Sequence, residues 1–373
     1  MKKSFFYLAM AIITLSVCFS GSLIAEEHYQ KDIGFDVFDL DTLASDESIT
    51  YCLNDDGLVV CSYKVLGEKM FFLWSKEQSI TLIDLPTNAM PNKINKVGQI
   101  AGNYIVAGNS RGFLWDSCIG FVDIGTLGGA NTWVTDLNNL GQVIGHSETG
   151  NISQLDNKVK EKHAFVFHQA LNKESVNMIK DLGSLSGDLG FMGDESIAIS
   201  INDYGEIVGA SNVVWFNNGK RIKSPLQGVI WKNENIECLL VLPNFEKTIG
   251  LAIDNLGNVL VTKNDSLFFL EADNHQENKL PFGNVYKARL TDSGKILLNN
   301  ATYYDSKHNF NSKQNRYSVT LGDVLDLTNN FYGFWNDISS FTDINSKGEI
   351  SGTAVTKFGD RHSIIMKPRG KLN

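Results

Sequence analysis

One pattern recurs along this chain: an apolar segment, then Asn-x-x-Gly, then a second apolar segment that often ends in glycine or serine. Asn or Asp at the first turn position can hydrogen-bond the backbone ahead of it, and Gly at the fourth accepts the left-handed conformation. The pattern therefore predicts a tight hairpin between two strands. The turn residues of the copies are Asn54 and Gly57, Asn95 and Gly98, Asn138 and Gly141, Asn202 and Gly205, Asp254 and Gly257, Thr291 and Gly294, and Asn345 and Gly348.

Two other segments accompany the hairpins. We name the hairpin strands a and b, a short aromatic strand c, and a strand ending near Asp-Leu or Asp-Ile-Gly d. The c segments are 70–74, 112–115, 163–167, 228–231 and 362–366, and the d segments are 82–85, 122–129, 179–185 and 324–327. Four short strands per repeat are the content of a propeller blade. The chain is therefore predicted to be an all-β propeller of about seven four-stranded blades. Weak repeats in the fifth and sixth units leave six or eight open.

The chain begins and ends at different strands of the repeat. Residues 35–40 resemble a d strand, and the last c strand, at 362–366, has no d strand after it. We expect the N-terminal strand to pair into the last blade and close the ring, which would leave no long sheet edge open.

The first residues have the features of a secretory signal peptide: a basic start, an apolar run, then small residues. We expect cleavage after Ala25, which gives a signal peptide at 1–25, one propeller domain at 26–368 and a tail at 369–373. Cleavage after Ser22 is the alternative. Lipidation of Cys18 is a separate alternative, although Val17 stands where a lipidation box needs a small residue. Without a second long apolar run, the mature chain is expected to be a periplasmic or extracellular monomer with no membrane span.

The net charge and the cysteine spacing argue against several kinds of partner and site. The net charge of −9 argues against nucleic acid or an anionic membrane as a partner. No Cys-x-x-Cys or paired Cys/His spacing suggests zinc. Cys52 and Cys61 flank one hairpin. Counting outward from its turn, however, places Cys52 opposite Val59 rather than opposite Cys61. A disulfide between the two cysteines would therefore need a bulge or a shifted register.

Several of these motifs resemble the HAF-type extracellular repeat family. They are His163-Ala164-Phe165, the sequence Asp-Ile-Gly-Thr-Leu-Gly-Gly at 123–129, Asp-Leu-Gly-Ser-Leu at 181–185, and the hairpins themselves. The resemblance covers about residues 80–235 and 340–366. It implies an exported repeat protein and no established activity.

The longest insertions are predicted to share one face of the ring. Those at 148–162 and 212–226 join strands b and c, and those at 186–195 and 328–337 join strand d to the next strand a. Antiparallel strands alternate their connections between two faces, so we expect a binding face there. The alternative is that these insertions are drift that the surface tolerates.

Aromatic residues in or beside those loops are the candidate ligand contacts. They are Trp133, Phe191, Phe331, Tyr332, Phe334 and Trp335. Such side chains could stack on sugar rings or anchor a protein partner, or they could fold inward and plug the ring. The aromatic residues of the c strands are expected in the core between blades.

No catalytic motif, cofactor motif or metal-ligand run is apparent. His163 and His362 occupy one repeat position, which we interpret as an exposed polar slot. The recurrent carboxylates Asp84, Asp123, Asp181 and Asp326 are expected to make structural hydrogen bonds. The sequence thus favours a secreted binding module for a protein or glycan ligand, without cofactor or metal. The alternatives are a carbohydrate-active hydrolase or lyase with carboxylates at the ring mouth, and a surface component whose repeats serve assembly.

Overall fold

The structure is a computed structural model in which every described element is a β-strand. It describes residues 27–28, 35–40, 47–77, 79–152, 160–169, 178–185, 195–218, 220–233, 235–240, 246–272, 277–298, 302–305, 310–311, 316–317, 324–326 and 335–369.

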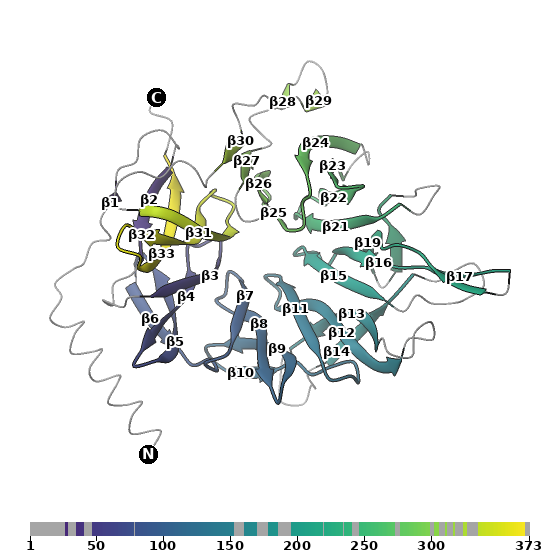
Figure 1. The fold of residues 1–373 in the computed structure, drawn as a ribbon, viewed down its shortest axis with the longest axis horizontal. Helices are drawn as coiled ribbons and strands as arrows, with labels where there is room; N and C mark the ends of the chain where they lie inside the picture. Colours follow the sequence, from purple (N-terminus) through teal and green to yellow (C-terminus); the bar gives the residue numbers. More distant parts are fainter. Residues whose placement is uncertain are drawn as a thin grey trace.

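Six four-stranded antiparallel sheets follow one another along the chain as blades of a β-propeller. Their first strands surround the centre and their fourth strands lie at the periphery (Figure 1). In sheet order the strands are β3 (Ser48–Leu53), β4 (Val59–Val65), β5 (Glu68–Ser75) and β6 (Ser79–Ile83); β7 (Met90–Ile94), β8 (Ile100–Val106), β9 (Asn109–Asp116) and β10 (Gly120–Asp123); β11 (Thr132–Leu137), β12 (Gln142–Ile152), β13 (Lys160–His168) and β14 (Met178–Gly183); β15 (Ser196–Ile201), β16 (Ile207–Ser211), β19 (Gln227–Lys232) and β20 (Asn235–Cys238); β21 (Thr248–Ile253), β22 (Val259–Lys263), β23 (Ser266–Leu270) and β24 (Glu277–Gly283); β25 (Ala288–Leu290), β26 (Lys295–Leu298), β27 (Thr302–Asp305) and β30 (Val324–Asp326).

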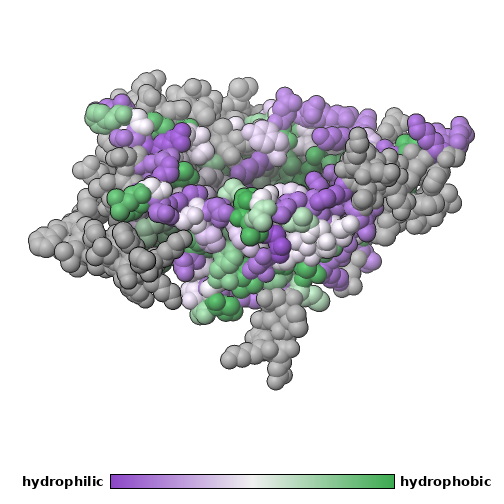
Figure 2. Space-filling view, turned by 60° about the horizontal axis from the view of Figure 1, so that its bottom comes forward, coloured by the Kyte–Doolittle hydropathy of each residue, from purple (hydrophilic) through white to green (hydrophobic). Residues whose placement is uncertain are grey.

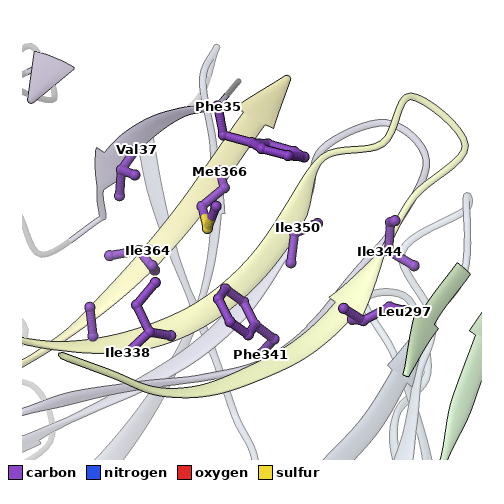
Figure 3. Close-up of a cluster of buried hydrophobic side chains, with 10 residues drawn as sticks. Phe35, Val37, Leu297, Ile338, Phe341, Ile344, Ile350, Ile364 and Met366 are labelled. Carbon is purple, nitrogen blue, oxygen red and sulfur yellow. The ribbon is translucent and has the colours of Figure 1, made fainter. Parts of the chain in front are cut away.

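A five-stranded sheet combines the two ends of the chain. Its order is β1 (Glu27–His28), β2 (Phe35–Asp39), β33 (Arg361–Pro368), β32 (Ile350–Thr356) and β31 (Trp335–Ile344). Strand β2 runs antiparallel to β33, with Phe38 opposite Ile365. Phe35 and Val37 are buried in one apolar cluster with Ile364 and Met366, as Figure 3 shows. This cluster also takes in residues of β31, β32 and β26, so β2 contributes to a core shared between sheets.

The hairpin turns have the predicted chemistry. Gly141 and Gly205, for example, are left-handed, with φ of 77° and 79°. The side-chain oxygen of Asn138 accepts the N–H groups of Leu140 and Gln142. Its amide nitrogen donates to the side-chain oxygen of Gln142, which explains why Gln or Glu often follows the turn glycine.

The same asparagine side chains also link one sheet to the next. Asn138 Nδ2 donates to the carbonyl of Asn202, 3.0 Å away in the following turn. Equivalent bonds to a backbone carbonyl join four other pairs of turns. At the fifth turn the second residue, Asn255, donates instead to the carboxylate of Asp292, and at the sixth a serine hydroxyl makes the link. The donor and acceptor residues are Asn345 to Asn54, Asn54 to Asn95, Asn95 to Asn138, Asn202 to Asp254, Asn255 to Asp292, and Ser293 to Ser346.

Replacing Asn138 by aspartate tests this link. Aspartate keeps the acceptor for the turn but removes the donor to Asn202 and places a charge where the side chain is buried. We expect the free energy of unfolding to fall by about 2 kcal/mol at pH 7 in urea titrations. The matched control is Asn88→Asp, because Asn88 also donates to a carbonyl, that of Ile105, but is exposed. An equal loss in the two variants would contradict the structural importance of the turn-to-turn bond.

The glycine that ends the repeat pattern is required for a different reason from the turn glycine. In six inner strands the register shifts by one residue shortly before the turn, as at Val134/Asp136 in β11. The carbonyl of Trp133 consequently lies 1.9 Å from where a Cβ on Gly145 would stand, and that of Ile197 equally close to one on Gly209. The glycines that end the repeat pattern therefore allow the first strand of the sheet to approach the second strand closely.

Two expectations need correction. Leu53 pairs with Val59, so Cys52 faces Val60 rather than Val59, because the hairpin turn holds one more residue than we counted. Cys52 and Cys61 are both buried, and no disulfide joins them. Long insertions are not confined to one face, since β28 (Phe310–Asn311) and β29 (Arg316–Tyr317) lie in a c–d connection. On the predicted face, the 212–226 insertion forms a hairpin of β17 (Val214–Asn217) and β18 (Lys220–Lys223).

Candidate functional site

The predicted ligand contacts are only partly within the described residues. Phe191, Phe331, Tyr332 and Phe334 lie outside them. Trp335 begins β31, where its backbone pairs with Thr356. Trp133 is therefore the member of this set whose surroundings can be followed in detail.

Trp133 is the middle of a stacked cluster at the start of β11. Its half-buried indole lies 4.9 Å from the His146 ring at an interplanar angle of 17°, and Lys162 Nζ lies 4.8 Å over the indole. Burial first, and then the charge of Lys162, lowers the pKa of His146 to about 4. The imidazole is thus neutral at pH 7, and its buried Nδ1 has no hydrogen-bond partner among the described residues.

A buried carboxylate lies next to this cluster. Glu148 accepts hydrogen bonds from the backbone N–H groups of Ala130 and Asn131 and from Lys160. Burial opposes its ionisation, but the hydrogen bonds of Asn131, Lys160 and Ala130 prevail and lower the pKa of Glu148. The carboxylate therefore fixes the loop around residues 130–131 and is already well occupied by donors.

The aromatic residues of the c strands are core, as predicted. Phe72, Trp74, Phe113, Trp115, Phe165 and Trp231 are all buried. Their burial removes them from the candidate ligand contacts.

The shared repeat position of the histidines is a half-buried, hydrogen-bonded position rather than an exposed slot. His163 Nδ1 lies 2.8 Å from Asp181, and His362 Nδ1 lies 2.8 Å from Asp39. Asp181 also accepts the N–H of Gly183, so this carboxylate makes the structural hydrogen bond that was predicted. Since d strands lie on the outer edge of each sheet, these carboxylates do not meet at the centre.

The opposite face carries a feature that the sequence analysis missed. The third turn residue is large, apolar and exposed in four successive sheets, and these residues form what we call the turn rim. Its members, with exposed fractions, are Val97 (71%), Leu140 (69%), Tyr204 (78%) and Leu256 (62%). Because the turns are hydrogen-bonded to one another, the side chains follow one edge. Apolar residues at turn positions were the available sequence signal.

A groove of about 630 Å³ adjoins this rim. Tyr204 and Leu256 stand at its edge, and its lining includes Val166, Leu182 and the buried Trp231. Its volume is within the range of ligand-binding clefts. Figure 2 shows one side of the molecule, where apolar residues form small groups among polar ones.

Charged groups border the groove on several sides. Lys232 Nζ makes an ion pair of 2.9 Å with Glu206. Burial, followed by the charge of Lys180, lowers the pKa of His168. The cleft thus combines apolar side chains with about as much polar and charged lining, a mixture found at recognition surfaces.

Neither a metal site nor a membrane helix is found within the described part of the chain. No cluster of three or more His, Cys, Asp or Glu side chains there could hold a metal ion. None of those residues forms a helix long and apolar enough to span a bilayer.

Comparison with known proteins bears on architecture alone. No family model matches the sequence and no curated protein does, so the resemblance to the HAF-type repeat family stays a prediction. Solved structures with distant similarity include virginiamycin B lyase from Staphylococcus aureus, at 10% identity and a TM-score of 0.47, covering 89% of this chain and 99% of that one. The β-propeller domain of the Trilobed protease from Pyrococcus furiosus has 13% identity and a TM-score of 0.48, covering 87% and 97%. Such values carry no argument about activity.

Proposed function

We propose that this protein is an exported binding module that recognises a protein partner through the turn rim and the adjoining groove. The observation that carries the proposal is the row of four apolar side chains, each more than 60% exposed, beside a groove of about 630 Å³. Exposed apolar groups in a row, with a cleft for an inserted side chain, are typical of protein interfaces.

A protein partner fits this surface better than a glycan. Sugar binding depends on dense hydrogen-bonding groups beside an aromatic platform, whereas the turn rim presents three aliphatic side chains and one tyrosine. The polar atoms behind the rim are already engaged: Asp203 accepts from Asn139 and Asn255 in the neighbouring turns. The rim therefore offers apolar contact more than hydrogen bonds.

We also propose that the five-stranded sheet is a seventh blade and that β2 closes the ring. The pairing of β2 with β33 supports closure, and so do the bonds on both sides of this sheet, from Asn345 to Asn54 and from Ser293 to Ser346. Closure makes the stability of the scaffold depend on the N-terminal strand.

The loop face around Trp133 is the second candidate surface for the same function. The stacked Trp133, His146 and Lys162 could contact a ligand there, as could the predicted aromatic residues of the neighbouring loops. The carbohydrate-active enzyme receives less support, because the recurrent carboxylates lie on outer strands.

Binding by matched variants tests the proposal. Residues 26–373 are screened for binding to surface proteins, to secreted proteins and to a glycan panel. Separate fractionation of the producing cells and their medium shows where the protein itself accumulates. The double variant Tyr204→Ser, Leu256→Ser removes two exposed rim side chains. We expect it to weaken partner binding by at least about 100-fold. The control Phe358→Ser removes an exposed side chain from the turn between β32 and β33, outside the groove lining, and should bind like the parent.

Two results would contradict the assignment. Binding that survives the rim double variant but disappears in Trp133→Ala would place the site on the loop face. Saturable binding of a glycan without any protein partner would overturn the ligand class.

A further inference from the structure

A layer of side chains lies at the centre of the propeller, one residue from each inner strand, two positions before the turn begins. Its members are Cys52, Lys93, Asp136, Ser200, Ala252, Arg289 and Asp343. Lys93, Asp136, Ser200, Ala252 and Arg289 line a cavity of about 130 Å³ that the turns surround. Charged residues at a central position are unusual enough to suggest a ligand.

Two cations of this layer converge on one carboxylate. Asp343 is 1% exposed, and Lys93 Nζ lies 2.9 and 3.1 Å from its two oxygens. Arg289 Nε lies 3.5 Å from one of these oxygens, within ion-pair range but longer than an ordinary hydrogen bond. One carboxylate therefore serves two cationic side chains from different sheets.

Arg289 is left incompletely satisfied by this arrangement. Its Nε is buried and has no hydrogen-bond partner among the described residues. A buried guanidinium nitrogen without an acceptor is costly, and such a group in a folded protein calls for an acceptor. The rest of the layer does not supply one.

A third cationic side chain lies close in sequence to Arg289. Lys287 lies two residues before Arg289, on the approach to the short strand β25. Burial lowers the pKa of Lys287 and the charge of Arg289 lowers it further, while Asp343 acts in the opposite direction. Three cationic side chains thus influence one another around the single carboxylate of Asp343.

Five other carboxylates line the cavity, and all five accept hydrogen bonds: Asp55, Asp136, Asp203, Asp254 and Asp292. Asp136 accepts from the N–H groups of Leu137 and Ile201 and from the Ser200 hydroxyl. At the mouth, Asp55 accepts from Ser346 N–H and Asp292 from Asn255 N–H. Arg289 Nε makes no hydrogen bond to any of these acids.

We propose that the cavity binds a small oxyanion, a carboxylate or a phosphate group, held by Arg289 with Lys93. Guanidinium groups bind both kinds of anion through directed, charge-assisted hydrogen bonds. A volume of about 130 Å³ holds roughly four waters at about 30 Å³ each, which suits one such group and little more. This site is separate from the turn rim and does not depend on the partner proposed for it.

Titration calorimetry with inorganic phosphate, sulfate and acetate tests the site. Residues 26–373 are used at pH 7 with ionic strength held constant by sodium chloride. We expect saturable binding of at least one anion with a Kd of about 1 mM or tighter. Comparison of acetate with phosphate and sulfate shows which anion the site prefers.

Substitutions with opposite expected effects separate binding from general damage. Arg289→Gln should weaken binding by at least about tenfold, because it removes the guanidinium charge. Asp343→Asn should tighten binding several-fold, because it frees two cations from their competing carboxylate. Lys64→Gln, which removes an exposed lysine paired with Glu47, should leave the affinity unchanged.

Other results would overturn the proposal. Absence of saturable binding by the parent with all three anions would do so. The same holds if Arg289→Gln binds like the parent, or if Lys64→Gln loses as much affinity as Arg289→Gln. If circular dichroism shows that Arg289→Gln does not fold, Lys93→Gln, which removes a cation that lines the cavity, takes its place with the same expected direction.

Discussion

Replacing Gly145 with alanine is expected to prevent folding or to lower the free energy of unfolding by about 3 kcal/mol or more. An added Cβ would stand 1.9 Å from the carbonyl oxygen of Trp133 and 3.0 Å from the Phe165 ring. The obstructing oxygen belongs to the backbone of β11, so no rotamer change can relieve the overlap. The inner strand would have to move away from β12, which breaks the register Val134–Gly145. Thermal and urea unfolding would measure the loss.

Gly98→Ala separates this steric effect from ordinary glycine strain. Gly98 is left-handed, with φ of 85°, but has open space where a Cβ would stand. Its replacement should therefore cost only about 1–2 kcal/mol, the cost of a left-handed alanine. If Gly145→Ala were as stable as Gly98→Ala, the close approach of β11 to β12 would be wrong.

Val37→Asp should destabilise the whole scaffold if β2 closes the ring. Val37 is buried in the cluster that joins β2 to β31, β32 and β33, opposite Met366 (Figure 3). An unpaired carboxylate there loses apolar burial and its own hydration, so we expect a loss of at least about 3 kcal/mol. The transition should remain single and move to lower urea concentration, because the damage affects the entire ring.

The control places the same charge on an exposed strand residue. Met178→Asp changes β14, where the side chain is 55% exposed, and should alter stability by less than about 0.5 kcal/mol. A parent-like transition for Val37→Asp would show that β2 is an appendage and that the ring does not need it.

The local chemistry of the repeat was predictable because it depends on neighbours in sequence. The Asn-x-x-Gly turns, the buried aromatic c strands and the all-β propeller class all follow from spacing and side-chain type. The register of β3 and β4 was misjudged by one residue, since a turn that contains a bulge cannot be counted from its ends. The exposed rim at Tyr204 and Leu256 was overlooked because apolar residues in turns were not weighed as a surface.

The sequence by itself determined the hairpins, the period of the repeat and the types of residue at each repeat position. Only the tertiary structure decided which of these positions meet. Lys93, Arg289 and Asp343 occupy the same place in distant repeats, and their charges interact only because the inner strands gather around one axis. Such contacts depend on how sheets pack against one another, over separations that no local spacing rule spans.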